Sequence, residues 1–214
     1  MKKVILLSLI FILLFSLVSV NSTYAGTSTA LGTLSYWYSD KSSIGRWNKS
    51  TIKVYRYKIN DNGDFYFVNG IEYACDQWMD ALDITLSDGS TSAYSSAPIK
   101  AYGGTKAEIN ALGVVTISDS ESINGKMIYT STTEGYWTYG STTITGKKIS
   151  KATIVILDND RTVAQYKKTC THEMGHALGW FGHSSYSTDI MYSKGSSVTS
   201  LTTRDKRQLV QVYD

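Results

Sequence analysis

The sequence predicts a single α+β domain, and three observations support this prediction. Short runs with strand-like alternation are interspersed with amphipathic segments that have helical spacing. The chain has 214 residues, enough for one domain with a substantial core. All three histidines lie within residues 172–183, in the spacing H-E-x-x-H-x-x-G-x-x-H on a predicted helix.

Residues 1–25 have the pattern of a cleavable export signal. Two lysines precede an apolar run over residues 4–20, and small residues at 23–25 give a cleavage site before Gly26. An uncleaved anchor is the alternative, because the run approaches the length that spans a bilayer. Small polar residues after the run favour cleavage. We therefore expect a secreted, extracellular protein whose domain comprises residues 26–214.

The charge of the mature chain argues against two classes of partner. Removal of the signal takes two of the 21 basic residues and leaves 19 against 18 acidic ones. This near-neutral balance predicts no nucleic-acid partner and no membrane-surface partner. The mature chain has no low-complexity run, repeat or obvious linker, so we expect one domain and a monomer.

The first part of the domain reads as strand, helix, strand. Residues 51–59 alternate apolar and basic side chains, as in a half-exposed strand. A helix is predicted to begin at an N-cap at Asn69, with Glu72 three residues later. One face of this helix carries Ile71, Ala74, Cys75, Trp78 and Leu82. Residues 83–89 read as a short strand. The acidic turn at 60–64 does not fit a calcium loop, so a solvated turn is favoured.

Residues 90–150 have the weakest patterns. We expect strands at 99–102, 114–118 and 126–129, a helical turn at 106–111, and a loop or hairpin at 135–145. The β-branched run at 152–157 predicts a further strand, which ends in a turn.

The following helix is the one that carries the histidine motif. Asp160 or Thr162 can cap it. Its buried face is predicted to comprise Val163, Tyr166, Cys170, Met174 and Ala177 or Leu178. His172 and His176 lie one turn apart on the opposite face and can point at the same position.

This spacing predicts a catalytic zinc site. Neutral imidazoles bind Zn²⁺ at roughly 2.0–2.1 Å, and a catalytic zinc takes three protein ligands and keeps one open position. Gly179 can adopt the left-handed conformation that ends a helix, which lets His183 return to the same ion. Glu173, beside the first ligand, can take a proton from the activated water. A closed structural zinc site is the alternative, but it needs a fourth protein ligand.

The extended motif, with Met191 a few residues past His183, resembles the metzincin metalloproteases. Ser184, directly after the third histidine, is similar to the matrixin branch of that group. The resemblance implies a zincin-like α+β fold: a twisted, mostly parallel sheet with an antiparallel edge strand, an active-site helix with a second helix packed on it, and a C-terminal helix after the Met-turn.

The resemblance also implies how the cleft is built. Met191 would form an apolar floor under the metal. The 152–157 strand would lie at the sheet edge along the cleft, where an extended peptide can add as a further strand. An ordinary buried strand is the alternative reading of the same run.

The C-terminal part departs from the family pattern in two places. Residues 206–213 read as the closing helix, with Leu209 and Val212 inward. Arg204 replaces the first of two paired acids that matrixins carry there. Asp205 fits the second, although a surface aspartate is the alternative.

The second departure follows the Met-turn. Tyr192 is followed by Ser193, Lys194 and Gly195, whereas matrixins place a proline that helps to wall the specificity pocket. We therefore expect this wall to be built differently.

Two cysteines leave one question open. Cys75 and Cys170 both lie on predicted inner faces, which suits either one disulfide in an exported protein or two buried free thiols.

The predicted function is that of a secreted zinc metalloendopeptidase. His172, His176 and His183 would bind one zinc ion, Glu173 would be the general base, and Gly179 and Met191 would support the site. Calcium remains open, without a clear motif. The expected partner is a protein or peptide in extended conformation. Two alternatives are a non-cleaving protein that binds a peptide or inhibitor, and a zinc hydrolase of non-peptide amides.

Overall fold

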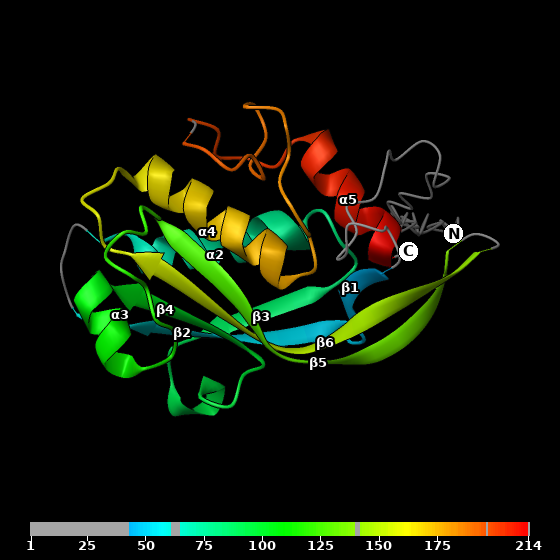
Figure 1. Ribbon diagram of the computed structural model, residues 1–214, viewed down its shortest axis with the longest axis horizontal. Helices are drawn as coiled ribbons and strands as arrows, with labels where there is room; N and C mark the ends of the chain where they lie inside the picture. The colour runs from blue at the N-terminus through cyan, green and yellow to red at the C-terminus, as the bar shows by residue number, and fades with distance from the viewer. Residues whose placement is uncertain (1–42, 61–64, 140–141, 196, 214) are drawn as a thin grey trace, which may run out of the picture.

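The computed structural model describes residues 43–60, 65–139, 142–195 and 197–213. One twisted sheet carries helices α2 (Phe67–Met79) and α4 (Val163–Ala177) side by side on one face (Figure 1). The predicted export signal and most of the acidic turn lie outside the described residues. Within the described part of the chain, no helix has the length and apolarity that a membrane crossing requires.

Six strands form the sheet. They are β1 (Ser43–Trp47), β2 (Thr51–Lys58), β3 (Thr85–Gly89), β4 (Ile99–Gly104), β5 (Gly125–Tyr139) and β6 (Thr142–Leu157). Their order is β1-β6-β4-β2-β3, with β5 paired to β6. Every pairing is parallel except the antiparallel β5–β6 pair. The predicted α+β fold, a mostly parallel sheet with one antiparallel edge strand, is confirmed.

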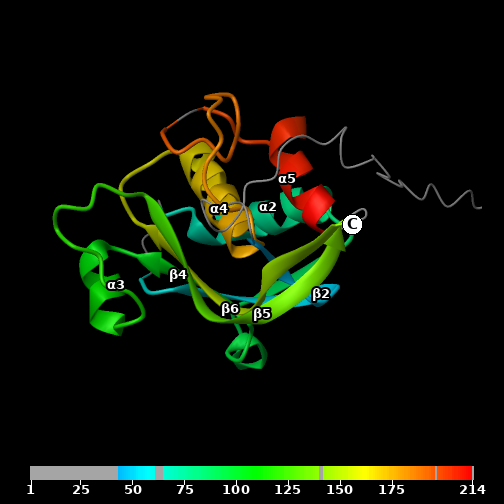
Figure 2. The same cartoon turned by 45° about the vertical axis from the view of Figure 1, so that its right-hand side comes forward.

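The identity of the edge strand differs from the prediction. Residues 152–157 belong to β6 and pair with β4 on one side and β5 on the other, so their predicted edge position is wrong. The edge strand is β5, which lies along the whole length of β6 (Figure 2). Residues 126–129 form part of it, and of the predicted loop or hairpin at 135–145, residues 135–139 belong to β5 and 142–145 to β6.

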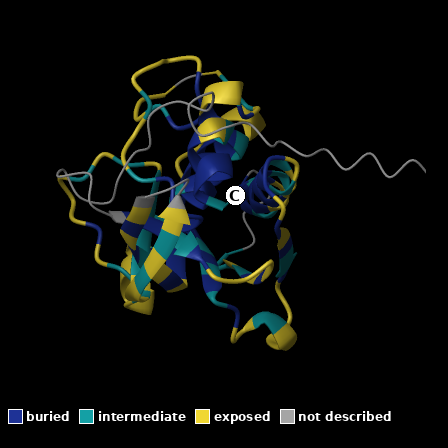
Figure 3. Cartoon of the chain, turned by 90° about the vertical axis from the view of Figure 1, so that its right-hand side faces the viewer, coloured by how far each residue is buried: buried dark blue, intermediate teal, exposed yellow. Residues whose placement is uncertain are grey.

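The main core lies between the sheet and the two helices, where buried residues gather in Figure 3. Four of the predicted inner residues, Ile71, Ala74, Cys75 and Trp78, lie on α2 and are buried, whereas Leu82 is buried but lies in the turn after the helix ends at Met79. Trp78 on α2 donates its indole N–H to the carbonyl oxygen of Thr171 on α4, at 2.9 Å. A Cβ on Gly70 would lie 2.6 Å from the sulfur of Cys170, so only glycine allows the helices to pack this closely.

A smaller cluster covers the other face of the sheet. Helix α3 (Lys106–Leu112) packs Ile109 against Val155 and Leu157 of β6. A capping box of Thr105 and Glu108 starts this helix, and its predicted position is confirmed. A short 3-10 helix, η1 (Ser92–Tyr94), lies between β3 and β4.

Several local predictions are wrong. Helix α2 begins two residues before Asn69, because Phe67 is fully buried and belongs to the helix. Residues 114–118 form no strand; Asn110 instead bonds both backbone groups of Ile117. β1 was not predicted, because residues 34–47 show no clear period. Val163, the first residue of α4, is 38% exposed, so its predicted place on the buried face is wrong.

The other helix predictions agree with the structure. Thr162, not Asp160, caps α4 through a capping box with Gln165. The remaining predicted inner residues of α4 are buried. Helix α5 (Thr203–Tyr213) starts three residues earlier than expected, and Leu209 and Val212 are buried as predicted.

Candidate metal centre

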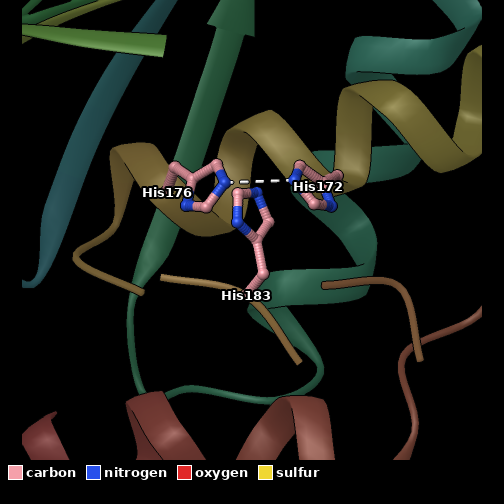
Figure 4. A group of neighbouring side chains, drawn as sticks. All are labelled: His172, His176 and His183. Atoms are coloured by element: carbon pink, nitrogen blue, oxygen red, sulfur yellow. Dashed lines mark hydrogen bonds between the residues drawn. The ribbon is translucent and has the colours of Figure 1, made fainter. Parts of the chain in front are cut away.

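Three histidines converge at the C-terminal end of α4 (Figure 4). His172 and His176 extend from consecutive turns of α4, and His183 approaches from the loop that follows it. One ligand nitrogen from each ring lies within 4.8 Å of the other two. The two Nε2 atoms of His172 and His176 are 3.1 Å apart.

Backbone carbonyl groups fix the tautomers of the two helical histidines. Nδ1 of His172 lies 2.8 Å from the carbonyl oxygen of Ile190, and Nδ1 of His176 lies 2.7 Å from that of Trp180. A carbonyl oxygen only accepts, so each neutral ring carries its proton on Nδ1 and leaves a lone pair on Nε2. Two such lone pairs cannot form a hydrogen bond with each other. Their 3.1 Å separation, dashed in Figure 4, approaches the roughly 3.3 Å between two ligands of a tetrahedral zinc ion.

Burial keeps these rings neutral. Loss of solvation, together with the neighbouring His176, lowers the pKa of His172 to about 3. Burial lowers the pKa of His176 to about 4 and also lowers the pKa of His183. Metal ligation requires neutral imidazole, so at neutral pH the three rings are in the state that could bind a metal ion.

Gly179 turns the chain back toward the metal site. Its φ is +110°, and a Cβ on it would lie 2.0 Å from the carbonyl oxygen of Gly45 on β1. Helix α4 therefore ends at Ala177, where Trp47 donates its indole N–H to the carbonyl at 2.8 Å. The reversal that the motif predicts thus depends on both a positive φ and a close approach to β1.

Glu173 lies beside the histidines and against β5. Its side chain is nearly buried, and the backbone N–H of Met127 donates to its carboxylate. A Cβ on Gly125 would lie 2.9 Å from Cγ of Glu173. Burial raises the pKa of Glu173 to about 8, while the positive charge of Lys168 opposes this shift. A carboxyl with a pKa near neutrality suits exchange of protons with a substrate.

Met191 packs beneath the histidines. It is fully buried, and a Cβ on Gly175 would lie 2.7 Å from its sulfur. Because Gly175 lies between His172 and His176 on α4, the thioether contacts the helix between the two ligand positions. This is the apolar floor that the Met-turn predicts.

The family comparison agrees with this arrangement. The family model for matrixins matches residues 46–214, which is most of the chain. The chain belongs to the matrixin family. The family implies a zinc metalloprotease, and the three histidines are a group that can hold the metal ion. A comparison with curated proteins gave no match.

The matrixin site contains a residue whose contacts the sequence did not predict. Asp205 is fully buried, and its carboxylate accepts hydrogen bonds from the backbone N–H groups of Ile190 and Met191, at 2.9 and 3.0 Å. It also accepts from Thr202. The same Ile190 carries the carbonyl group that orients His172. The surface alternative for Asp205 is therefore wrong, and its match to the matrixin pattern was the available signal.

Arg204 holds a second buried aspartate of this matrixin. Its guanidinium makes two hydrogen bonds to Asp189, at 3.0 and 2.8 Å. The hydroxyl of Ser184, next to His183, donates to the same carboxylate at 2.6 Å. Burial alone would raise the pKa of Asp189, but bonds from Arg204, Ser184 and Thr202 outweigh it and lower the pKa. Arg204 thus stabilises the loop that carries His183, through Asp189 and Ser184.

The wall after the Met-turn is built around a lysine of α4. The Lys168 ammonium donates to the carbonyl oxygens of Tyr192 and Lys194, at 3.2 and 2.6 Å. Tyr192, Lys194 and Gly195 line a cleft of about 790 Å³ that also contains the three histidines and Glu173. These hydrogen bonds from α4 hold the loop that follows Met191, where the matrixin proline is absent.

The two cysteines of this matrixin are free thiols. Cys75 and Cys170 are both buried, and no disulfide joins them. Burial raises the pKa of each thiol well above its ordinary value, so both remain protonated. The free-thiol alternative describes the structure.

Proposed function

We propose that this matrixin is a secreted zinc-dependent endopeptidase in which His172, His176 and His183 hold the ion and Glu173 is the general base. One observation carries the proposal. Carbonyl groups fix the tautomers of His172 and His176, so that their Nε2 lone pairs face the ring of His183. The buried carboxyl group of Glu173 lies beside them. The donor set suits zinc, because the cluster found among the described residues consists of three imidazoles without a fourth protein ligand. When bound, zinc supplies Lewis acidity to the scissile carbonyl group and to an attacking water.

Residues of the protein carry out the proton transfers and hold the reacting groups in position. Glu173 takes a proton from the attacking water on a carboxylate oxygen and passes it to the nitrogen of the leaving amine. The N–H of Met127 keeps this carboxylate in place. Closure of the site by Met191 excludes water from beneath the ligands.

The free side of β5 supports an extended substrate. Residues 125–129 pair with β6 on one side only, and the N–H of Met127 points away from β6 toward Glu173. An extended peptide can pair with this edge through main-chain hydrogen bonds, close to the general base. Export of the protein rests on the signal pattern of residues 1–25.

The test uses purified residues 26–214 loaded with zinc. A peptide-library digest read by mass spectrometry should show cleavage that a chelator abolishes and that Glu173→Ala lowers by at least 100-fold. Glu134→Ala, which removes an exposed glutamate of the β5–β6 hairpin, is the matched control and should keep full activity.

Two results would contradict the proposal. Zinc-loaded protein that binds peptides but cleaves none would instead support the binding protein. Cleavage restricted to non-peptide amides would support the other hydrolase.

A further inference from the structure

The cleft beside the metal site is lined by basic side chains. Lys126, Arg161, Lys168 and Lys194 all contribute to it. Glu173 is the one carboxylate among the lining residues that the structure describes. The substrate path next to the general base therefore carries an excess of positive charge.

Lys168 is the most informative of these residues. It is 8% exposed and lies one turn before His172 on α4. Its ammonium has three donors, and the carbonyl oxygens of Tyr192 and Lys194 take two of them. None of the ion pairs among the described residues includes Lys168. Burial lowers the pKa of Lys168, and the carboxylates of Asp205 and Glu173 oppose this only in part and without a direct ion pair, so a ligand carboxylate within reach of the ammonium would be favourable.

Arg161 adds a second cation without a carboxylate partner. Its guanidinium donates to the hydroxyl of Thr169 at 2.7 Å and to the carbonyl oxygen of Leu157 at 3.2 Å. Its Nε is buried and has no hydrogen-bond partner. Lys126 differs, because Glu121 lies 3.0 Å from its ammonium. Lys168, Arg161 and Lys194 are therefore the cleft cations that form no ion pair among the described residues, and Lys168 is the buried one nearest the histidines.

The remaining lining fits the aliphatic part of an acidic residue. Ile123, Met127 and Ala164 add apolar surface to the lining of the same cleft. A carboxylate on a short aliphatic stem thus matches both the charge and the surface of the cleft.

We propose that this cleft binds a carboxylate of the substrate, with Lys168 as its main partner, and so selects peptides that carry an acidic side chain close to the bond that is cut. This inference rests on the proposed protease function. The same chemistry is available from the free C-terminus of a short peptide, and the test separates these two sources.

The test compares peptide pairs built on a sequence that the library digest identifies. One pair has Glu or Gln in the cleft position, and the other has a free or an amidated C-terminus. The zinc-loaded wild type should favour Glu over Gln by about tenfold or more in kcat/KM. Added salt should reduce this preference. If the Glu and Gln peptides are cleaved equally well but amidation of the C-terminus lowers kcat/KM, the bound carboxylate is that of the peptide end.

Lys168→Met should bring the Glu to Gln ratio close to one. Lys167→Met is the matched control, because its ammonium lies over the Tyr73 ring, 4.4 Å from the centroid, and it does not line the cleft. If Lys168→Met does not fold, Lys194→Met tests the exposed rim and should lower the ratio about threefold. A ratio near one in the wild type for both peptide pairs, or an unchanged ratio in Lys168→Met, overturns the inference.

A binding measurement separates this inference from the protease proposal. Fluorescence anisotropy of labelled peptides with zinc-loaded Glu173→Ala needs no cleavage, and it should show the same preference for the carboxylate. A purely structural Lys168, or one that only adjusts Glu173, predicts equal losses for Glu and Gln peptides. Cleavage without preference refutes the inference alone, whereas preference in binding without cleavage refutes the protease alone.

Discussion

Nδ1 of His172 donates to the carbonyl oxygen of Ile190 at 2.8 Å, and this bond joins the active-site helix to the Met-turn. The N–H of Ile190 donates in turn to the carboxylate of Asp205, at 2.9 Å. A proposed metal ligand is thus oriented by a peptide group that Asp205 on α5 holds in place. Such outer contacts set the tautomer and the direction of a ligand nitrogen.

Asp205→Asn should weaken zinc binding by about 10–100-fold, because an amide cannot accept both the Ile190 and the Met191 N–H groups as a carboxylate does. Competition with a fluorescent zinc chelator measures the change. Asp80→Asn is the control. Asp80, at the end of α2, is an exposed ion-pair partner of Lys206, which follows Asp205 on α5, so this substitution should leave the zinc affinity unchanged. Equal affinities in all three proteins would show that the Met-turn orients itself without Asp205.

Gly125→Ala should lower kcat at least tenfold while zinc content stays complete, because the new Cβ would lie 2.9 Å from Cγ of Glu173. The general base must then move from the position that Met127 fixes. Steady-state kinetics with metal analysis of the same samples checks this. A fully folded Gly125→Ala variant with wild-type kcat would contradict this prediction, because it would show that the added Cβ does not displace the Glu173 side chain.

Gly179→Ala should destabilise the protein by about 3 kcal/mol or more, through both the positive φ and overlap with the carbonyl oxygen of Gly45. Gly113→Ala is a matched control: its φ is +67°, but no atom lies within 4 Å of the added Cβ. It should cost only about 1 kcal/mol. Urea unfolding of both variants separates the conformational cost from the steric one. Similar losses in the two would remove the role of the Gly45 contact.

Glu173 should make the metal-free protein less stable as pH rises. Its pKa is about 8 in the folded chain against an ordinary 4.5, so the folded state retains a proton that the unfolded state has lost. Its stabilisation is complete below pH 4.5 and is lost as pH rises through 8. Between pH 5.5 and 7.5 the free energy of unfolding should fall by about 1–3 kcal/mol relative to that of Glu173→Gln. Because both proteins share the three histidines, the difference isolates Glu173. Parallel stability curves would contradict the raised pKa.

Local patterns in the sequence predict much of this structure. Three features depend on residues only a few positions apart: the histidine spacing, the inner face of α2 and the cap at Thr162. Helical spacing and capping signals in the sequence therefore predict them directly. The parallel sheet and the Met-turn come from the resemblance to matrixins, which the family model supports.

Long-range contacts explain what the sequence did not predict. Residues 126–129 carry little pattern of their own, and their place at the sheet edge depends on pairing with β6. Asp205 looks like any aspartate in a first helical turn, because its partners are N–H groups of residues 190 and 191. Lys168 reads as a surface lysine, and only the loop that covers it makes it buried.

The contribution of α5 to the Met-turn has a consequence for synthesis of the chain. The histidine motif is translated before residue 205, so a nascent polypeptide can contain all three imidazoles while the peptide groups at 190 and 191 still lack their acceptor. We therefore expect the three-histidine geometry to be complete only after α5 has docked on the Met-turn, so the proposed hydrolytic activity should arise only once the whole domain has folded.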